Sequence, residues 1–286
     1  MNKRKHYQDI VDYYVGSEIA YKEGWDLTKS MAIHYGYYDD KVGSFTQALV
    51  RTNEVMSEVA DIKESDFVLD AGCGVGGSCI YLSQQIGCDT TGITLTPRQV
   101  ELAQNNAEKY NVADKTTFEV KDYTDTNFPN NSFDVVWALE SVCHAIRKED
   151  FISEAYRLLK PGGRLIMADY FMAKENLTEQ DQVVLDNWFE GWSLPHLDTI
   201  DRLKNQIETL NMRIVHKEEA TDKIMNSANR MYYLAILSKI YTKMMALIGI
   251  KWKNRANVLN AQGAYWQKKA LNRGLWKYQI VCAVKS

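Results

Sequence analysis

The sequence predicts an α/β protein built on a doubly wound sheet of seven strands, with helices on both faces. From residue 66 onward, short apolar runs alternate with segments of helical periodicity, which is the pattern of βαβ units. The first apolar run passes directly into a glycine-rich stretch, VLDAGCGVGG. Ligands of such sheets bind outside the carboxyl ends of the strands, so the functional site is expected at that edge.

The strands are short runs of apolar and β-branched residues, continuous where both faces are buried and alternating near the C-terminus. They are predicted at residues 66–72, 88–95, 116–122, 133–139, 163–171, 212–218 and 276–286. Helices are predicted between them at residues 75–87, 97–110, 151–159, 186–192 and about 198–210. Pro97 suits the first turn of the second helix, and Pro161, Gly162 and Gly163 are expected to end the third.

The chain divides into two predicted parts. Residues 1–60 are expected to form a helical, tyrosine-rich lid, and residues 61–286 contain the sheet. Helical insertions at about 172–205 and 218–275 interrupt the second part and are expected to cap the ligand edge of the sheet.

The cysteines and the N-terminus indicate a cytoplasmic protein. Five cysteines without a CxxC pair argue against a disulfide framework or a zinc ribbon, and favour reduced thiols. The basic residues near the N-terminus precede no apolar run, so no secretory signal is expected.

Charge is distributed unevenly along the chain, although its net value is only −3. Residues 223–286 contain 12 Lys or Arg and no Asp or Glu. This basic segment either faces the acidic remainder of the protein or contacts anions, among which an anionic membrane surface is the partner we expect.

The apolar run at 231–250 is long enough to span a membrane, but Lys239 and Lys243 lie near its middle. Each lysine would cost about 2.5–3.5 kcal/mol at the centre of a bilayer. Their i, i+4 spacing opposite Leu237, Tyr241, Met244 and Ile248 predicts an amphipathic helix instead. Such a helix is expected to be buried against its own protein, with contact to a membrane surface as the alternative.

The glycine loop predicts a nucleotide site, because glycine lets the backbone approach a ligand and the following helix presents free N–H groups. Its spacing differs from the dinucleotide fingerprint, since the third glycine comes early, at Gly76. Asp70 would repel a pyrophosphate, yet it suits a cationic aminoacyl ligand such as S-adenosylmethionine (SAM). The alternative is a tight strand-to-helix turn without a ligand.

Four stretches carry a resemblance to a known family: VLDAGCGVGGS, GITLTPRQ, KDYTDTNFPNNSFDVVWALES and RLLKPGGRLIMADYF. They resemble class I SAM-dependent methyltransferases, which implies a Rossmann-like seven-stranded methyltransferase sheet. Within that class the chain is most similar to the γ-tocopherol and sterol C-methyltransferases. GITLTP and KKALNRGLWKYQIVCAVK resemble the tocopherol enzymes, ALESVCHA resembles the sterol enzymes, and HYGYYDD matches the aromatic N-terminal segment of the group.

The resemblance implies which residues bind SAM, with S-adenosylhomocysteine as the product. Asp70 would hold the amino group, while Gly72 and Gly74 would let the methionine part lie against the backbone. No acid ends the second strand, so the ribose contacts implied are Thr94, Leu95 and Gln99.

The remaining implied cofactor contacts follow the third and fourth strands. Asp122 would accept a hydrogen bond from the adenine amino group, with Tyr123 beside the ring, although Asp122 also suits a turn residue. Glu140 follows the fourth strand and would either bind SAM or orient His144.

Methyl transfer from a sulfonium requires near-attack geometry in a dry pocket, and aromatic faces tolerate a cation while excluding water. Aromatic side chains in the lid and in the first insertion are therefore the expected acceptor contacts, although many such residues serve only as core. The predicted contacts are Trp25, Tyr35, Tyr37, Trp188 and Trp192.

Methylation at carbon also requires a base that removes a proton. His144 is the first candidate and Glu140 the second, whereas His34 from the lid is weaker and His196 weaker still. A structural role for His144 stays open. A Cys143–His144 nucleophile pair is disfavoured because adjacent side chains rarely form a productive hydrogen bond. No metal is expected, since no ligand pair has a usable spacing.

These features predict a methyltransferase that acts on a hydrophobic terpenoid, prenylquinone or sterol-like acceptor, most simply at carbon. N- or O-methylation of a natural product or an amine is the alternative. A non-catalytic SAM-binding protein is disfavoured, because the glycine loop, the loop with His144 and the predicted lid are all present. Nucleic acid is not an expected partner, because no NPPY or DPPY motif follows the fourth strand.

Overall fold

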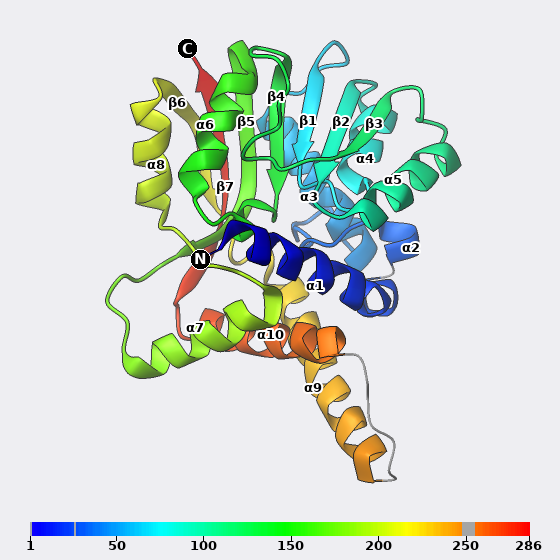
Figure 1. Cartoon of the computed structure of the whole chain (residues 1–286), viewed down its shortest axis with the longest axis vertical. Coiled ribbons are helices and arrows are strands. Elements are labelled where there is room, and N and C mark those ends of the chain that lie inside the picture. The colour runs from blue at the N-terminus through cyan, green and yellow to red at the C-terminus, as the bar shows by residue number, and fades with distance from the viewer. Residues whose placement is uncertain (1, 26, 248–254) are drawn as a thin grey trace.

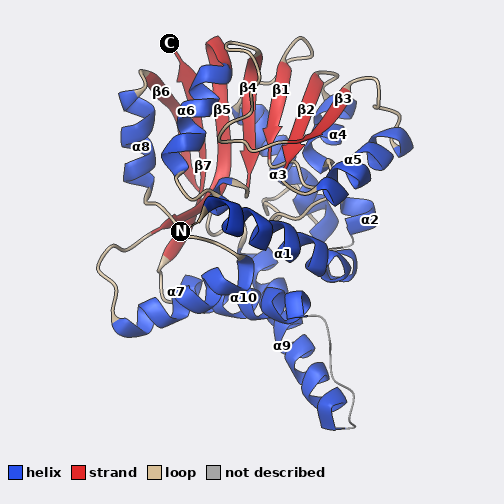
Figure 2. Cartoon of the chain, in the orientation of Figure 1, coloured by secondary structure: helices blue, strands red, loops and turns tan. Residues whose placement is uncertain are grey.

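The computed structural model describes residues 2–25, 27–247 and 255–286. A seven-stranded sheet forms the centre, with helices on both faces (Figures 1 and 2). The strands are β1 (Phe67–Ala71), β2 (Asp89–Thr94), β3 (Thr116–Val120), β4 (Phe133–Leu139), β5 (Leu159–Met172), β6 (Met212–Glu219) and β7 (Trp276–Lys285). Their order is β3-β2-β1-β4-β5-β7-β6, and only the pairs that involve β7 are antiparallel. The predicted fold class is confirmed.

The helices form two layers on the sheet and a third beyond its ligand edge. They are α1 (Lys3–Gly24), α2 (Leu27–Ser30), α3 (Phe45–Val59), α4 (Gly77–Gln85), α5 (Pro97–Lys109), η1 (Val142–His144), α6 (Lys148–Leu158), α7 (Glu179–Trp192), α8 (Ile200–Thr209), α9 (Met225–Leu247) and α10 (Arg255–Asn272). α3 contacts α4 on one face of the sheet, and α6 contacts α8 on the other. α1 crosses the carboxyl ends of the parallel strands, and α7 and α10 lie beyond it (Figure 1).

The strand order reverses between β1 and β4, which therefore form the topological switch point of the sheet. Almost every residue of both strands is buried, as expected for parallel strands covered on both faces. The glycine loop leaves β1 at this point, and the loop with Glu140 leaves β4 beside it. Two loops that lie far apart in the sequence are thus placed together at the expected ligand edge.

The sequence predicts that Pro161–Gly163 ends a helix. In the structure this stretch lies inside a strand instead. α6 ends at Leu158, and β5 begins at Leu159. The pairing with β4 shifts register there, because Phe133 pairs with Leu159 whereas Val135 pairs with Arg164. Irregularities of this kind accommodate extra residues on one strand, and Gly162 provides a positive φ of 77°.

The predicted lid of residues 1–60 occupies two places. α1 and α2 lie at the ligand edge, whereas α3 packs against α4 and β5 as part of a layer on the sheet (Figure 1). The first predicted insertion is likewise divided, since α7 lies in the outer layer and contacts α10, while α8 packs on β6 and α6.

α9 differs from the expectation that it is buried against its own protein. Its buried residues, Ser227, Ala228, Met231 and Ala235, all lie in the first half of the helix. From residue 236 to 247 no side chain is buried, and this part extends away from the rest of the molecule (Figure 1). Residues 248–250 of the predicted helical run lie outside the described residues. Among the helices of the described residues, none is long and apolar enough to cross a membrane.

Candidate active site

The glycine loop joins β1 to α4 with a backbone that only glycine adopts easily. Gly72, Gly74 and Gly76 all have positive φ, of 103°, 52° and 86°. A Cβ atom on Gly72 would lie 2.3 Å from the Cβ atom of Ser141, in the loop after β4. The loop is therefore packed tightly against its neighbour, and its turn leads into the N-terminus of α4.

A cavity adjoins this loop. All nine residues that the sequence predicts as cofactor contacts line it, namely Asp70, Gly72, Gly74, Thr94, Leu95, Gln99, Asp122, Tyr123 and Glu140. α1 supplies another wall through Tyr7, Ile10 and Tyr14. Tyr7 and Ile10 are not predicted by sequence reasoning; the tyrosine-rich pattern of the N-terminal segment indicates a lid without indicating which side chains face inward.

Asp70 is a nearly fully buried carboxyl group in the wall of this cavity. Burial raises its pKa to about 7, and the hydrogen bond from the Cys79 thiol lowers it only weakly. A buried carboxylate with one weak donor is stabilised by a cationic ligand. The amino group of SAM fits this requirement, so the residues present suit the cofactor that the loop predicts.

Thr94 and Gln99 form a pair at the end of β2 and the start of α5. The Thr94 hydroxyl donates to Gln99 Oε1 over 2.7 Å, and both side chains are buried in the wall of the cavity. This hydrogen bond fixes the orientation of the Gln99 amide. A neutral amide and hydroxyl thus stand where many nucleotide sites carry an acid, and both groups can hydrogen-bond to a ribose.

Asp122 is a turn residue that also lines the cavity. Its carboxylate accepts from the N–H and O–H groups of Thr124 over 2.8 and 2.7 Å, which is an Asx turn. It also accepts from the Tyr7 hydroxyl over 2.7 Å and pairs with Lys3 over 2.9 Å. Burial raises the pKa of Asp122, but these donors outweigh burial and lower it below its usual value. Asp122 therefore connects α1 to the loop after β3.

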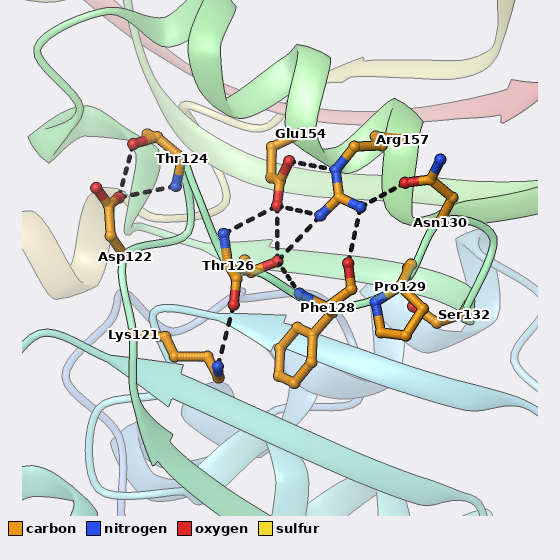
Figure 3. A network of polar contacts seen from close by, with 10 residues as sticks. All are labelled: Lys121, Asp122, Thr124, Thr126, Phe128, Pro129, Asn130, Ser132, Glu154 and Arg157. Carbon is orange, nitrogen blue, oxygen red and sulfur yellow. Dashed lines mark hydrogen bonds and ion pairs between the residues drawn. The ribbon is translucent and has the colours of Figure 1, made fainter.

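A polar network fixes the rest of this loop (Figure 3). Glu154 of α6 accepts from the N–H and O–H groups of Thr126 and pairs with Arg157. Arg157 also donates to the Phe128 carbonyl and to Asn130 Oδ1. The loop that carries Asp122 and Tyr123 is thus held against α6, which gives the cavity a rigid wall.

A second cavity adjoins the first and is mainly aromatic. Its rings come from α1, the lid, β5 and α7: Tyr13, Tyr14, Tyr21, Trp25, Tyr35, Tyr170 and Trp192. Three of the five predicted acceptor contacts, Trp25, Tyr35 and Trp192, are among them. The other two, Tyr37 and Trp188, line neither cavity. Both are buried, and the Tyr37 hydroxyl donates to Glu218.

The two cavities share one wall, formed by Tyr14, Ile33, His34, Glu140 and His144. All three predicted catalytic residues belong to this wall. His196, the weakest base that sequence reasoning considers, lines neither cavity.

Glu140 is held at this wall by three donors. The Tyr35 N–H and the Tyr278 hydroxyl donate to Oε1 over 2.7 and 2.8 Å, and the Tyr170 hydroxyl donates to Oε2. Tyr170 and Tyr278 are directly paired residues of β5 and β7. Glu140 also has a φ of 50°, a conformation that costs a non-glycine residue of order 1–3 kcal/mol and often occurs at functional sites. Burial raises the pKa of Glu140 to about 8, and the three donors oppose that rise.

His144 is oriented by Tyr14 and Ser193. Its Nδ1 lies 3.4 Å from the Ser193 carbonyl and its Nε2 lies 3.0 Å from the Tyr14 hydroxyl. Because a carbonyl only accepts, Nδ1 carries the hydrogen and Nε2 accepts from Tyr14. Burial lowers the pKa of His144 to about 3 and that of His34 to about 4, so both rings are neutral near pH 7. The described hydrogen bonds of the Glu140 carboxylate come from tyrosines and none comes from His144. They therefore do not support the hypothesis that Glu140 orients His144.

Cys143 lies between Glu140 and His144 in the sequence. Its side chain is buried, and burial raises the pKa of its thiol well above the usual value. Such a thiol is inert as a nucleophile. The residues that the structure describes contain no group of three or more His, Cys, Asp or Glu side chains arranged to hold a metal ion.

The fold, the glycine loop and the cavity lined by the predicted cofactor contacts are those of a class I SAM-dependent methyltransferase domain. Residues 69–167 match the family model described as a methyltransferase domain. The resemblance stated from the motifs is thereby confirmed.

Several relatives come from the group that the motifs predict. The sterol 24-C-methyltransferase of Pneumocystis carinii is 32% identical over 232 residues, which cover 80% of this chain and 58% of that protein. The chloroplastic tocopherol O-methyltransferase of Arabidopsis thaliana is 28% identical over 221 residues, covering 71% of this chain and 62% of that protein. The chain spans little more than half the length of the sterol methyltransferases it matches.

Among solved structures, geranyl diphosphate C-methyltransferase from Streptomyces coelicolor A3(2) superposes with a TM-score of 0.71. The match covers 98% of both chains at 15% sequence identity, so it shows a shared fold over nearly the whole molecule, outer helices included.

Proposed function

We propose that this protein transfers the methyl group of SAM to a carbon atom of a neutral, hydrophobic acceptor of the terpenoid, prenylquinone or sterol-like class. The observation that carries the proposal is the wall shared by the two cavities. A cavity with every predicted SAM contact meets an aromatic cavity at a wall that contains a buried carboxyl group and two neutral imidazoles. The sterol and tocopherol relatives named above support the acceptor class.

The charges around the aromatic cavity favour a neutral acceptor over a phosphorylated one. Among the described residues that line the two cavities, none is Lys or Arg. A diphosphate or phosphate group buried there would lack a cationic partner, which makes its desolvation costly. An apolar, unphosphorylated acceptor avoids this cost.

A polar cluster in the aromatic cavity favours an acceptor that carries an oxygen atom. Asn260 Nδ2 donates to the hydroxyls of Tyr13 and Tyr21 over 2.8 and 3.2 Å, and these two hydroxyls lie 2.7 Å apart. One phenol hydrogen joins the two hydroxyls, so the other is available to a hydroxyl or carbonyl oxygen of the acceptor. Burying this cluster against a pure hydrocarbon would leave that donor unpaired, at a cost of about 1–3 kcal/mol.

The geometry favours Glu140 over His144 as the base. A base works best when its pKa is near the working pH, and the pKa of Glu140 is about 8, whereas that of His144 is about 3. Glu140 also faces both cavities, and its carboxylate is held by three donors. His144, a neutral ring hydrogen-bonded to Tyr14, would instead form part of the wall between SAM and the methyl acceptor.

The chemistry that follows uses the π electrons of an electron-rich double bond or ring. They attack the methyl carbon, the carbon–sulfur bond breaks, and its electron pair stays on sulfur as SAM becomes S-adenosylhomocysteine. The acceptor then carries the positive charge, which the aromatic faces and the Glu140 carboxylate stabilise. Glu140 takes a proton from carbon, and the released electron pair restores the double bond.

We also propose that the protein is cytoplasmic and contacts an anionic membrane surface peripherally through its basic segment, residues 223–286. Acceptors of the proposed class dissolve in lipid, and a protein that acts on them gains from contact with the surface that holds them.

Incubation with SAM labelled in its methyl carbon tests the proposal. The probes are a prenylated hydroquinone, a sterol with a double bond in its side chain, and geranyl diphosphate. We expect the label on carbon in at least one neutral probe and none on geranyl diphosphate, with the position of the label read by NMR. Label on nitrogen or oxygen when amines and alcohols are supplied, with no carbon product from any probe, would contradict C-methylation.

A further inference from the structure

The second half of α9 presents apolar side chains to solvent on one face. Leu237, Met244 and Leu247 are 60%, 62% and 87% exposed. Spacings of three, four and seven residues place the exposed apolar residues of this part on one stripe of the helix. The stripe consists of Leu237, Ile240, Tyr241, Met244 and Leu247.

This stripe lies opposite the face by which α9 packs on the protein. At 100° per residue, Met231 and Ala235, which are buried, fall on the other side of the helix from Leu237 and Met244. Figure 1 shows the second half of α9 extending beyond α7 and α10, away from the sheet. Among the residues that the structure describes, the stripe therefore stays largely exposed, and exposed apolar patches of this kind often mark an interaction surface.

Lysines border the stripe. Lys239 and Lys243 belong to the same part of α9, and neither forms an ion pair with any residue in the described parts of the chain. The Lys239 ammonium lies 5.5 Å from the centre of the Tyr265 ring. No acidic residue occurs between 223 and 286, so the nearby sequence offers these lysines no carboxylate.

We propose that the exposed half of α9 docks on an anionic lipid bilayer, with the apolar stripe in the interface and the lysines at the headgroups. Interfacial helices combine an apolar face with lysines on the polar face and bury about 5–10 Å into the bilayer boundary. A second copy of this chain is a poorer occupant, because a symmetric contact through α9 would place lysines beside lysines in a segment without acids. Anionic headgroups are complementary to the same charges.

The proposal deepens the membrane contact proposed above by naming the element that makes it. α9 contributes Met231 to the aromatic cavity, but this residue lies in the packed half of the helix, and the exposed half lines neither cavity. Lipid binding is therefore measured without methyl transfer, and failure of one proposal is distinguishable from failure of the other.

Flotation with vesicles tests the proposal. The full-length protein is expected to bind vesicles of phosphatidylcholine with phosphatidylglycerol, to bind pure phosphatidylcholine much less, and to be released at high salt. K239E/K243E should lower the partition coefficient at least about 25-fold, since each lysine near the surface contributes about fivefold. L237Q/M244Q, which changes only exposed side chains, should lower it at least about tenfold.

Matched controls separate the surface from general effects of charge and polarity. K109E/K204E makes the same charge change on the exposed lysines of α5 and α8, and V183Q replaces an exposed apolar residue of α7. Both should bind vesicles as the wild type does, and E140Q should too. Equal loss in the control variants, or no preference for anionic vesicles, would overturn the proposal. Dimerisation that L237Q/M244Q abolishes, without vesicle binding, would assign the stripe to a second copy instead.

Discussion

Replacing Glu140 with Gln is expected to lower kcat by about 10²–10⁴-fold, the usual contribution of a positioned base. Gln keeps an oxygen that accepts from the Tyr35 N–H and Tyr278 hydroxyl groups, so the loop should keep its position. What Gln removes is the group that takes the proton and the negative charge that stabilises the cationic acceptor. Steady-state kinetics on a carbon acceptor measures the loss, and calorimetry with SAM should show a change in affinity below about tenfold.

H144N is the comparison for this variant. His144 is neutral and hydrogen-bonded to Tyr14 and Ser193, so we expect its replacement to reduce kcat by about tenfold or less through the position of the Tyr14 ring. A large loss in H144N with a nearly unchanged rate in E140Q would reverse the assignment and make His144 the base. Circular dichroism and the midpoint of thermal unfolding show whether either variant has lost its fold.

Replacing Gly72 with Ala is expected to abolish measurable SAM binding. The residue has a φ of 103°, and the new Cβ atom would approach the Cβ atom of Ser141 to 2.3 Å, which forces the loops after β1 and β4 apart. Strain of this kind costs of order 1–3 kcal/mol from the backbone alone. Because both loops line the first cavity, their separation changes the site as well as the stability. Calorimetric titration with SAM and thermal unfolding measure the two effects.

Gly162→Ala is the matched control. Gly162 also has a positive φ, of 77°, but no atom lies within 4 Å of the position of its Cβ atom. This variant carries the backbone strain without the clash and lies away from the cavity. It should lose some thermal stability and bind SAM as the wild type does. Equal SAM affinity in both variants would show that the glycine loop does not hold the cofactor as proposed.

Much of the sheet and of the cofactor wall could be predicted from the sequence, because both depend on local patterns. The run FVLDA followed by clustered glycines predicts β1 and its turn, and each cofactor residue follows a strand whose carboxyl end meets the same edge of the sheet. Their shared position is thus a consequence of the α/β fold.

What the sequence does not predict depends on contacts between distant residues. Tyr278 reaches Glu140 only because β7 inserts antiparallel beside β5, which pairs Tyr278 with Tyr170. Asn260 reaches Tyr13 across 247 positions of the chain. Sequence reasoning places His144 first because it lies on the loop beside the expected methyl-donor end of SAM. No local pattern reveals that burial lowers the pKa of His144 to about 3 and raises that of Glu140 to about 8.

α9 shows the converse case. The sequence predicts an apolar face for this helix, but a pattern does not say which surface covers that face. The helix packs through a separate face of small residues, such as Ala228 and Ala235, and leaves the predicted apolar face in solvent.

The pH dependence of kcat/KM for the acceptor, measured with SAM saturating, tests the central claim most directly. Asp70, whose pKa is about 7 in the empty cavity, is then paired with the SAM amino group and does not add a titration of its own. Only the ionised Glu140 accepts a proton, so the rate should rise with pH and level off above an apparent pKa of about 8. In E140Q the residual rate should lose this dependence. With His144 as the base, whose pKa is about 3, the wild-type profile would instead be flat between about pH 6 and 9. A flat profile, or a rise that persists in E140Q, would contradict the account.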